Sequence, residues 1–418
     1  MKTRAVRLYG VEDLRIDEFE LPEISDDEIL ARVVADSLCL SSYKGAKLAT
    51  SHKRIPPDIA ERPIIIGHES CGEIVQVGKR WQHKFKPGQK FTVQPAFNYN
   101  GSLRAGGYSY THFGGNATYV IIPVEALLMD CVFIYEGTDY FGGSLTEPLS
   151  CVAGTFHAMY HTDQGRYEHH MGIKEGGNMA LLAAAGPMGL AAINYILGCD
   201  RRPAKLMVTD IDDARLARAA KILPPEYAAE RGVELKYLNT AALADADGEL
   251  MKFTDGNGYD DIVVFAAVTP VVEQADRILG IDGCLNFFAG PADTQFGARL
   301  NFFNVHYSRT HIVGTTGGNS EDMKEVLDMV SQGKLDPAIL VTHIGGLDCV
   351  PETTLNLPKI PGGKKLIYTG IDLPLVAIAD FRCLGETDPR FAHLADITEA
   401  NNGLWCEAAE KYLLANFN

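Results

Sequence analysis

The stretch Asn178-Met179-Ala180-Leu181-Leu182-Ala183-Ala184-Ala185-Gly186-Pro187-Met188-Gly189 is an apolar run that leads into a glycine turn. It predicts a buried strand followed by a helix. In such a turn Gly186 would let the backbone approach a pyrophosphate, Pro187 suits the first helical position, and Gly189 allows the helix to pack closely on the strand. Ala184 stands at the first glycine position of the G-x-G-x-x-G pattern, so the pattern is incomplete.

The end of the next predicted strand indicates which nucleotide would bind. Asp210 lies there, 24 residues after Gly186. A carboxylate at this place would accept hydrogen bonds from an adenosine ribose and repel a 2′-phosphate. The sequence therefore favours NAD over NADP, with Arg215 as the nearest base that could reverse the choice. The predicted nucleotide-binding residues are Gly186, Pro187, Met188, Gly189, Asp210 and Arg215.

From about residue 150 onward, apolar strands alternate with helical stretches. This alternation predicts βαβ units and a doubly wound parallel sheet, an α/β Rossmann domain that we assign to residues 151–315. The predicted strands are 178–184, 205–209, 261–266, 284–288 and 310–313, and the predicted helices are 187–197, 213–223 and 271–279.

The first 150 residues consist of short stretches rich in β-branched residues, separated by turn signals, which predicts a barrel-like β domain. A helix at 321–332 and strands at 339–342 and 365–369 are expected to return to it, so we assign this domain to residues 1–150 and 316–418. Its C-terminal extension, 373–418, ends in a predicted helix over 402–417. The apolar face of that helix contains Trp405, Ala408, Ala409, Tyr412 and Leu413.

The bulk composition excludes several classes of protein. With 418 residues, 46% hydrophobic and 22% charged, the chain has the balance of an ordinary globular protein. A net charge of -16 argues against binding to nucleic acid, which requires a basic face. The sequence shows no signal-peptide pattern, no run of 18 apolar residues and no CxxC pair among its nine cysteines. We expect a cytoplasmic protein that is not bound to a membrane.

Potential metal ligands occur in the β domain at Cys39, His68, Glu69 and Glu147. Thiolate, imidazole and carboxylate are suitable zinc donors, and a catalytic zinc site keeps one position open for water or substrate. Each residue alone is uninformative, because a single cysteine or histidine usually has a packing role. The order of the motifs is informative: Cys39 precedes Gly67-His68-Glu69, which precedes Glu147-Pro148 and then the nucleotide turn.

This order resembles the medium-chain, zinc-containing alcohol dehydrogenase family over residues 1–372. The resemblance implies a GroES-like β-barrel catalytic domain joined to the Rossmann domain, and hydride transfer between NAD and an alcohol or ketone. It also implies that Cys39 and His68 are zinc ligands and that Glu69 is a direct or water-mediated third ligand. Glu147 would be a carboxylate that exchanges with metal-bound water, and Ser41 would relay the proton of the alcohol.

Finer features of the resemblance point to a substrate class. The form Glu147-Pro148-Leu149-Ser150 resembles the sorbitol dehydrogenase branch, which favours a polyol or ketose. The long C-terminal end resembles the L-sorbose 1-phosphate reductases within the family, which would reduce L-sorbose 1-phosphate to glucitol 6-phosphate. A phosphate needs a cationic anchor, and Lys44 is the candidate, with Lys47, Lys53 and Arg54 following in the same region.

The chain departs from the family in two places. Ser42 stands where an aspartate is common, which leaves the outer proton path open. Between Phe91 and Glu147 the only cysteine is Cys131, so the four-cysteine lobe that holds a structural zinc in many relatives is missing, and an alternative loop is expected over 98–115. We therefore expect one zinc per chain, in a homo-oligomer (a dimer or a tetramer).

Two alternatives are a zinc-free, NADPH-dependent quinone or enone reductase on the same fold, and a non-catalytic nucleotide-binding protein. Neither would need Cys39, His68, Glu69 and Glu147 together.

Overall fold

The apolar run around Ala180 forms strand β11 (Asn178–Leu182) in a computed structural model of the chain, which describes residues 1–291 and 293–417. Within those residues, β11 belongs to a sheet of six strands in the order β13-β12-β11-β14-β15-β16, and all neighbouring pairs are parallel. This is the strand order of a doubly wound Rossmann sheet. The other strands are β12 (Lys205–Asp210), β13 (Glu234–Asn239), β14 (Tyr259–Val264), β15 (Leu279–Phe287) and β16 (His311–Val313).

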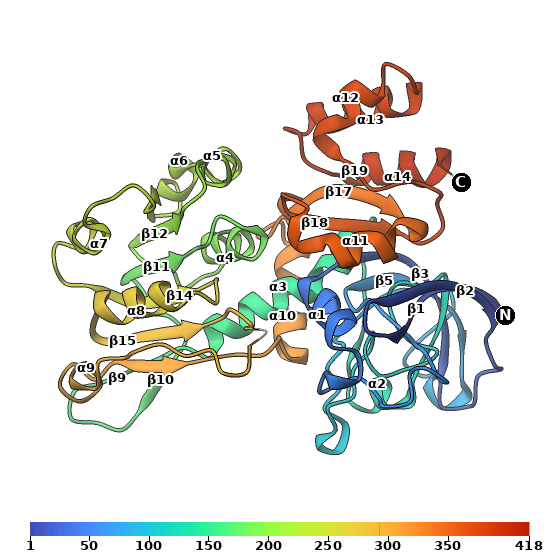
Figure 1. Ribbon diagram of the computed structural model, residues 1–418, viewed down its shortest axis with the longest axis horizontal. Coiled ribbons are helices and arrows are strands. Elements are labelled where there is room, and N and C mark those ends of the chain that lie inside the picture. Colours follow the sequence, from blue (N-terminus) through green and yellow to red (C-terminus); the bar gives the residue numbers. More distant parts are fainter. Residues whose placement is uncertain (292, 418) are drawn as a thin grey trace. The chain divides into compact units, whose positions relative to one another are not determined.

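Helices alternate with these strands along the chain and lie along the sheet (Figure 1). Parallel strands need crossover connections, and the crossover helices bury the sheet from water. Leu250, Val272 and Ile278, from two of these helices, pack with the apolar side chains of β11 and β14. The helices are α4 (Pro187–Gly198), α5 (Asp213–Ile222), α6 (Pro225–Ala229), α7 (Ala246–Phe253), α8 (Thr269–Ile278) and α9 (Phe302–Tyr307), and a hairpin is formed by β9 (Tyr160–Thr162) and β10 (His169–Met171).

The described residues divide into two compact units. The first consists of Met1–Glu147, Asn319–Ser331 and Pro337–Asn418, and the second of Pro148–Gly318 and Gln332–Asp336. The second unit contains the parallel sheet and the range 151–315 that we assigned to the Rossmann domain. No helix of the described residues has both the length and the apolarity that crossing a membrane requires.

The first unit is built mainly from antiparallel strands. Its larger sheet, in the described residues, has the order β19-β17-β18-β3-β5-β6-β8, with β7 paired to β3, and a smaller sheet has the order β2-β1-β4. The strands are β1 (Lys2–Gly10), β2 (Asp13–Glu20), β3 (Ile29–Leu38), β4 (Ile64–Ile65), β5 (Ser70–Val77), β6 (Lys90–Val93), β7 (Tyr119–Ile122), β8 (Val132–Ile134), β17 (Val341–Gly346), β18 (Lys364–Tyr368) and β19 (Val376–Ala377).

Several helices that begin in the first unit were not predicted from the sequence, among them α1 (Leu40–Leu48) and α3 (Phe141–His157). Helix α3 contains Gly142, Gly143 and Pro148, which disfavour a helix interior. It forms because its first turns are almost entirely buried and tertiary packing outweighs local propensity. The remaining helices are α2 (Val124–Leu128), α10 (Ser320–Ser331), α11 (Val350–Asn356), α12 (Phe381–Leu384), α13 (Pro389–Ala400) and α14 (Glu407–Asn416).

The C-terminal extension adds strand β19 to the edge of β17 and packs α12, α13 and α14 near that edge (Figure 1). The predicted apolar face of its last helix is partly wrong, because α14 begins only at Glu407 and Ala408 is exposed. Trp405 lies before the helix and is fully buried. Glu410, a charged residue absent from the predicted face, is 1% exposed.

Glu410 connects the extension to helix α3. Its carboxylate accepts hydrogen bonds from the backbone N–H groups of Tyr140 (2.7 Å) and Phe141 (2.9 Å), where α3 begins, and from the Tyr368 hydroxyl (2.7 Å). The Trp405 indole donates in turn to Tyr368 (2.8 Å). A carboxylate is the favoured partner for the free N–H groups of a helix N-terminus. The extension therefore caps the helix that carries Glu147.

We expect Glu410→Ala to lower the free energy of unfolding by about 2–3 kcal/mol, because it leaves buried donors without an acceptor. Glu407→Ala is the matched control, since Glu407 lies on the same helix and pairs with exposed Lys411. Urea denaturation followed by circular dichroism measures both variants. Equal stabilities for the two would show that the extension does not anchor α3.

Candidate metal centre and nucleotide-binding turn

The antiparallel pairing of β3 and β5 brings the predicted metal ligands together. In this ladder Asp36 lies opposite Ser70, so the end of β3 and the start of β5 meet at one edge. Cys39 follows β3 and is the N-cap residue of α1, while His68 and Glu69 immediately precede β5. The ligand atoms of Cys39, His68 and Glu69 all lie within 4.8 Å of one another. One thiol, one imidazole and one carboxylate at this spacing fit zinc.

The His68 ring is oriented by hydroxyl groups from α1. Nδ1 of His68 lies 3.3 Å from the Ser42 hydroxyl, and Nε2 lies 3.1 Å from the Ser41 hydroxyl. The Ser41 hydroxyl also donates to the Cys39 sulfur at 2.9 Å. Tyr108 packs against the imidazole, with ring centroids 5.1 Å apart. Ser42, where the family pattern has an aspartate, thus contacts Nδ1 of His68. Ser41 contacts both Nε2 of His68 and the Cys39 sulfur.

Glu69 has more partners than the sequence could indicate. Its carboxylate accepts hydrogen bonds from the Lys364 ammonium, at 2.6 Å to one oxygen, and from the Ser37 hydroxyl. Lys364 is 5% exposed and Glu69 is 1% exposed, so the ion pair is buried. Burial would lower the pKa of Lys364, but the charges of Glu69 and Cys39 outweigh it and raise the pKa. The ion pair therefore fixes the Glu69 side chain beside Cys39 and His68.

Lys364 was not identified from the sequence. The signal was present, because Lys364-Lys365 opens a short strand that continues as Leu366-Ile367-Tyr368. A lysine in a buried strand needs a polar partner, since lysine is almost never fully buried unpaired. Lys365 finds backbone carbonyls, including that of Gly363 at 2.8 Å. Nothing in the local pattern says that Lys364 pairs with an acid 295 residues earlier in the chain.

Glu147 lies in α3 and is 7% exposed. Burial raises its pKa to about 7, with His68 opposing the shift and Glu69 adding to it. The Ser144 hydroxyl, one turn earlier in α3, donates to the backbone carbonyl of Glu69 at 2.5 Å, which fixes the helix to the metal loop. Glu147 is not part of the group of ligand atoms within 4.8 Å. It is instead a buried carboxyl group whose pKa responds to the charges of His68, Glu69 and Cys39.

The thiol of Cys39 is also affected by its surroundings. Burial raises its pKa, and the Lys364 charge and the Ser41 hydrogen bond oppose the shift. A thiol coordinates a metal as thiolate, and a bound cation would supply the missing stabilisation.

The loop over 98–115, which replaces the cysteine-rich lobe, packs directly on the metal loop. The Gly115 N–H donates to the Gly67 carbonyl at 2.7 Å. Gly107 has φ +74°, and a Cβ atom there would lie 2.1 Å from the Gly67 carbonyl oxygen, so only glycine allows this approach. The loop thereby buries the residues on both sides of His68.

In the second unit, the predicted nucleotide turn joins β11 to α4. Pro187 is the first residue of α4, and Gly186 is its N-cap, with open space where a Cβ would lie. At Gly189 a Cβ would lie 1.8 Å from the Ala184 carbonyl oxygen, so glycine is required for the helix to pack on the strand. Ala183 has φ 55°, a left-handed conformation that is uncommon outside glycine. Strained backbone of this kind occurs often at ligand-binding turns.

Asp210 ends β12 and faces this turn. Its carboxylate accepts hydrogen bonds from the backbone N–H groups of Ala185 (3.1 Å), Ile211 (2.8 Å) and Asp212 (3.2 Å). Arg215 is paired with Asp212, at 3.7 Å, and is largely exposed. The carboxylate thus lies at the glycine turn, and the base that could reverse its preference has an acidic partner of its own.

Lys44, the predicted phosphate anchor, lies in α1, three residues after Ser41. Its side chain is half-buried. Side chains three residues apart lie on the same face of a helix.

A Rossmann sheet in one chain with a thiol–imidazole–carboxylate group, whose imidazole and carboxylate are buried, is typical of metal-dependent, nucleotide-linked dehydrogenases. The chain belongs to the zinc-binding dehydrogenase family. The family model for zinc-binding dehydrogenases matches residues 187–332, and the model for the alcohol dehydrogenase GroES-like domain matches residues 25–130. The protein is an oxidoreductase of the alcohol dehydrogenase type, as predicted, and the predicted combination of a GroES-like domain and a Rossmann domain is confirmed.

Curated relatives match almost the whole chain. Mannitol-1-phosphate 5-dehydrogenase from Aliivibrio fischeri is 51% identical over 99% of this chain and 97% of its own length. L-sorbose 1-phosphate reductase from Klebsiella pneumoniae is 47% identical over 99% and 98%. Among solved structures, a zinc-binding dehydrogenase from Sinorhizobium meliloti bound to NADP has a TM-score of 0.71 and 21% identity, covering 88% of this chain and 99% of that chain. The predicted likeness to the sorbose-phosphate group is confirmed.

Lys364→Met should lower the free energy of unfolding by about 3–5 kcal/mol, since it leaves a buried carboxylate without its counter-charge. The double variant Lys364→Met/Glu69→Gln should be more stable than Lys364→Met alone, because the unpaired charge is gone. Chemical denaturation of the metal-free wild type, the two single variants and the double variant measures the four free energies of unfolding of this double-mutant cycle. Additive effects of the two changes would contradict a direct pair.

Proposed function

We propose that this protein is a zinc- and NAD-dependent oxidoreductase that interconverts a polyol phosphate and a ketose phosphate, with the reduction of L-sorbose 1-phosphate to glucitol 6-phosphate as the reaction to test first. The observation that carries the proposal is the group of Cys39, His68 and Glu69, in which His68 and Glu69 are buried and Cys39 is partly buried. The two curated relatives, both named for phosphorylated six-carbon substrates, support the substrate class. A zinc-free reductase or a non-catalytic protein would have no use for this donor set.

Cys39 and His68 would hold the zinc, with Glu69 as a direct or water-mediated third ligand and Glu147 able to exchange with bound water. When bound, zinc polarises the substrate oxygen as a Lewis acid. We assign one zinc per chain, because the loop over 98–115 has no cysteines to hold a second one. The contacts of the Ser41 hydroxyl to Cys39 (2.9 Å) and His68 (3.1 Å) support its role as the proton relay of the alcohol.

NAD, held at the turn of Gly186 and Gly189, would supply the hydride acceptor for oxidation of the carbinol carbon, and Ser41 would take the hydroxyl proton and pass it outward. Reduction runs the same steps backwards. Glu147, with its pKa of about 7, can accept or release a proton near neutral pH. Tyr108 and the loop over 98–115 bury His68 and limit the access of water to it.

We propose NAD as the cofactor, bound at Gly186, Pro187, Met188 and Gly189, with Asp210 on the ribose. The position of Asp210 at the glycine turn supports this choice. Arg215, paired with Asp212, would stay at the rim of the site. We also place the protein in the cytoplasm, because all nine cysteines are free thiols and a reducing compartment preserves them.

We propose that the protein is a homo-oligomer, at least a dimer, joined through the edge of the Rossmann sheet. Strand β16 forms that edge in the described residues, and Ile312 on it is 43% exposed. Phe302, Phe303 and Tyr307 of α9 are 74%, 64% and 68% exposed. An edge strand can pair with its own copy about a twofold axis, and a monomer rarely leaves such aromatic side chains in water. Light scattering would give the number of subunits.

The wild-type protein should oxidise NADH with L-sorbose 1-phosphate and contain one zinc per chain. Cys39→Ala should lose both the zinc and the activity while keeping its cooperative unfolding, because the site closes no small core. Elemental analysis, an absorbance assay at the NADH band and circular dichroism provide the readouts. Two zinc ions per chain, or full activity without metal, would contradict the proposal.

Asp210→Ala should raise KM for NAD and increase the relative use of NADP, because the ribose partner is lost and a 2′-phosphate is no longer repelled. Asp213→Ala is the control, because it removes a neighbouring charge and leaves the pair of Arg215 and Asp212 in place. The ratio of kcat/KM for NADP to that for NAD separates cofactor choice from loss of fold. A wild-type preference for NADP would refute the assignment.

Lys44→Ala should raise KM for L-sorbose 1-phosphate about tenfold and change KM for L-sorbose little, because only the phosphate makes the lost contact. Lys47→Ala, on the same helix but ion-paired with Glu12 at 2.9 Å, serves as the control for charge. If KM rose equally for both substrates, Lys44 would have a structural role. If the wild type used L-sorbose and its 1-phosphate equally well, the phosphate would not be recognised.

A further inference from the structure

The first unit contains a groove that the reaction described above does not use. It encloses about 680 Å³ between the segment 53–64 and the loop 102–113, a size typical of small-molecule sites. Lys53, Arg54, Arg62 and Arg104 line it, against the carboxylates of Glu28 and Asp58. A net positive groove is unusual in a chain with a net charge of -16.

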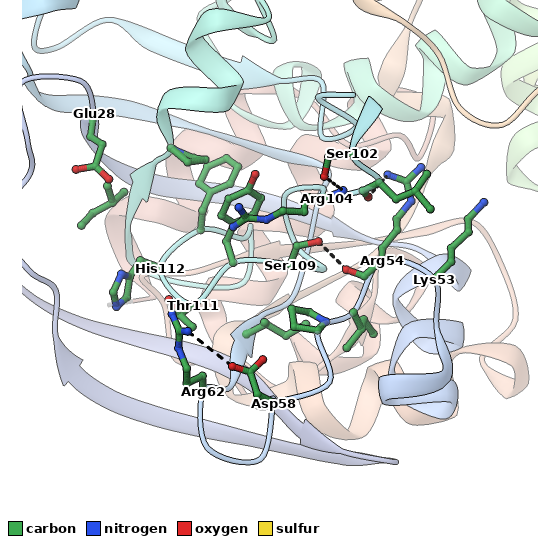
Figure 2. A pocket seen from close by; sticks show the side chains of 18 residues that line it. Glu28, Lys53, Arg54, Asp58, Arg62, Ser102, Arg104, Ser109, Thr111 and His112 are labelled. Atoms are coloured by element: carbon green, nitrogen blue, oxygen red, sulfur yellow. Dashed lines mark hydrogen bonds and ion pairs between the residues drawn. The ribbon is translucent and has the colours of Figure 1, made fainter. Parts of the chain in front are cut away.

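The cations of the groove differ in how far they are already neutralised. Arg62 lies 3.7 Å from Asp58, and Arg104 lies 3.1 Å from Glu125. The Arg54 guanidinium donates only to the Leu103 carbonyl, at 3.4 Å, and Lys53 has neither a hydrogen bond nor an ion pair within the part of the chain that is described. Figure 2 shows Lys53 and Arg54 at one end of the groove, and Asp58, Arg62 and His112 at the other. The first end is therefore the one with uncompensated positive charge.

This end of the groove is held in place by the loop. The Ser109 hydroxyl donates to the Arg54 carbonyl at 2.6 Å, and the Ser102 hydroxyl accepts from the Arg104 N–H at 3.1 Å (Figure 2). A preformed backbone lowers the entropy lost when the neighbouring side chains bind a ligand. Two cations on a fixed frame are the usual means of binding a phosphate monoester.

A row of rings connects the groove to the metal centre. His68 contacts Tyr108, with centroids 5.1 Å apart, and Tyr108 stacks on His52 at 5.4 Å. Lys53 and Arg54 directly follow His52, and Ser109 directly follows Tyr108. Burial lowers the pKa of His52, and the charges of Arg54 and Lys53 lower it further, so their field reaches the row. Two rings, those of Tyr108 and His52, therefore lie between the metal ligand His68 and the cationic end.

We propose that the Lys53–Arg54 end of this groove is a phosphate subsite for polyol phosphates whose phosphate lies several carbons from the reacting carbon; this rests on the proposed function. Lys44, one helical turn from Ser41, is suited to a phosphate next to the reacting carbon, as in L-sorbose 1-phosphate. When a polyol 1-phosphate reacts at carbon 5, its phosphate lies further from the metal centre. Lys53 and Arg54 are the cations suited to that position. With both subsites, one metal centre would act on substrates whose phosphate lies next to the reacting carbon and on substrates whose phosphate lies several carbons away.

The test uses the zinc-loaded protein and two probes, inorganic phosphate and mannitol 1-phosphate. Calorimetry should show that Lys53→Ala and Arg54→Ala each weaken the binding of both probes about tenfold, the loss expected for one charged contact. Arg54→Lys, which keeps the charge, should retain most of the affinity. Lys47→Ala, which removes the same charge outside the groove, is the matched control. Equal affinity in all these proteins would overturn the subsite.

Enzyme kinetics then show whether the phosphate that binds at this end belongs to the substrate or to a separate ligand. KM for mannitol 1-phosphate should rise about tenfold in Lys53→Ala, with a smaller change for L-sorbose 1-phosphate and for mannitol, and inorganic phosphate should compete with mannitol 1-phosphate. Phosphate that binds through Lys53 and Arg54 without competing would assign the groove to a separate phosphorylated ligand and overturn the subsite. If the wild type turned over no polyol phosphate while both residues still controlled phosphate binding, the proposed function would fail and an anion site would remain.

Discussion

The buried ion pair of Glu69 and Lys364 is the constraint around which the first unit is organised. It joins the loop before β5 to the start of β18, segments 295 residues apart. Neither charge could be buried without the other, because an isolated buried ion costs several kcal/mol. The pair therefore forces the late segment of the chain to return to the metal loop. The pair also fixes the Glu69 side chain within 4.8 Å of the ligand atoms of Cys39 and His68.

Helix α3 extends this constraint to the rest of the site. Ser144 bonds the Glu69 carbonyl, Glu410 of the extension caps the helix start, and Glu147 lies one turn further along. A shift at the start of α3 would move Glu147 relative to His68. The C-terminal extension is thus connected to the reacting groups through backbone hydrogen bonds, although it lies outside the region that resembles the wider family.

The loop over 98–115 explains how the protein can lack a cysteine-rich lobe and still order this part of the β domain. Its glycines approach the metal loop so closely that hydrogen bonds replace a metal as the fastening. The same loop supplies the serines that hold the cationic end of the groove.

Periodicity and spacing are local properties, so the sequence by itself determined the described Rossmann strands other than β13, the glycine turn at Gly186 and Gly189, and the order of the potential metal ligands. It could not reveal α3, whose glycines and Pro148 oppose a helix until burial outweighs them. The partner of Glu69, the cap formed by Glu410 and the hydroxyl bonds of Ser41 and Ser42 to His68 were decided only by tertiary structure. Buried charges and donors require partners, but the chain must fold before distant residues can become those partners.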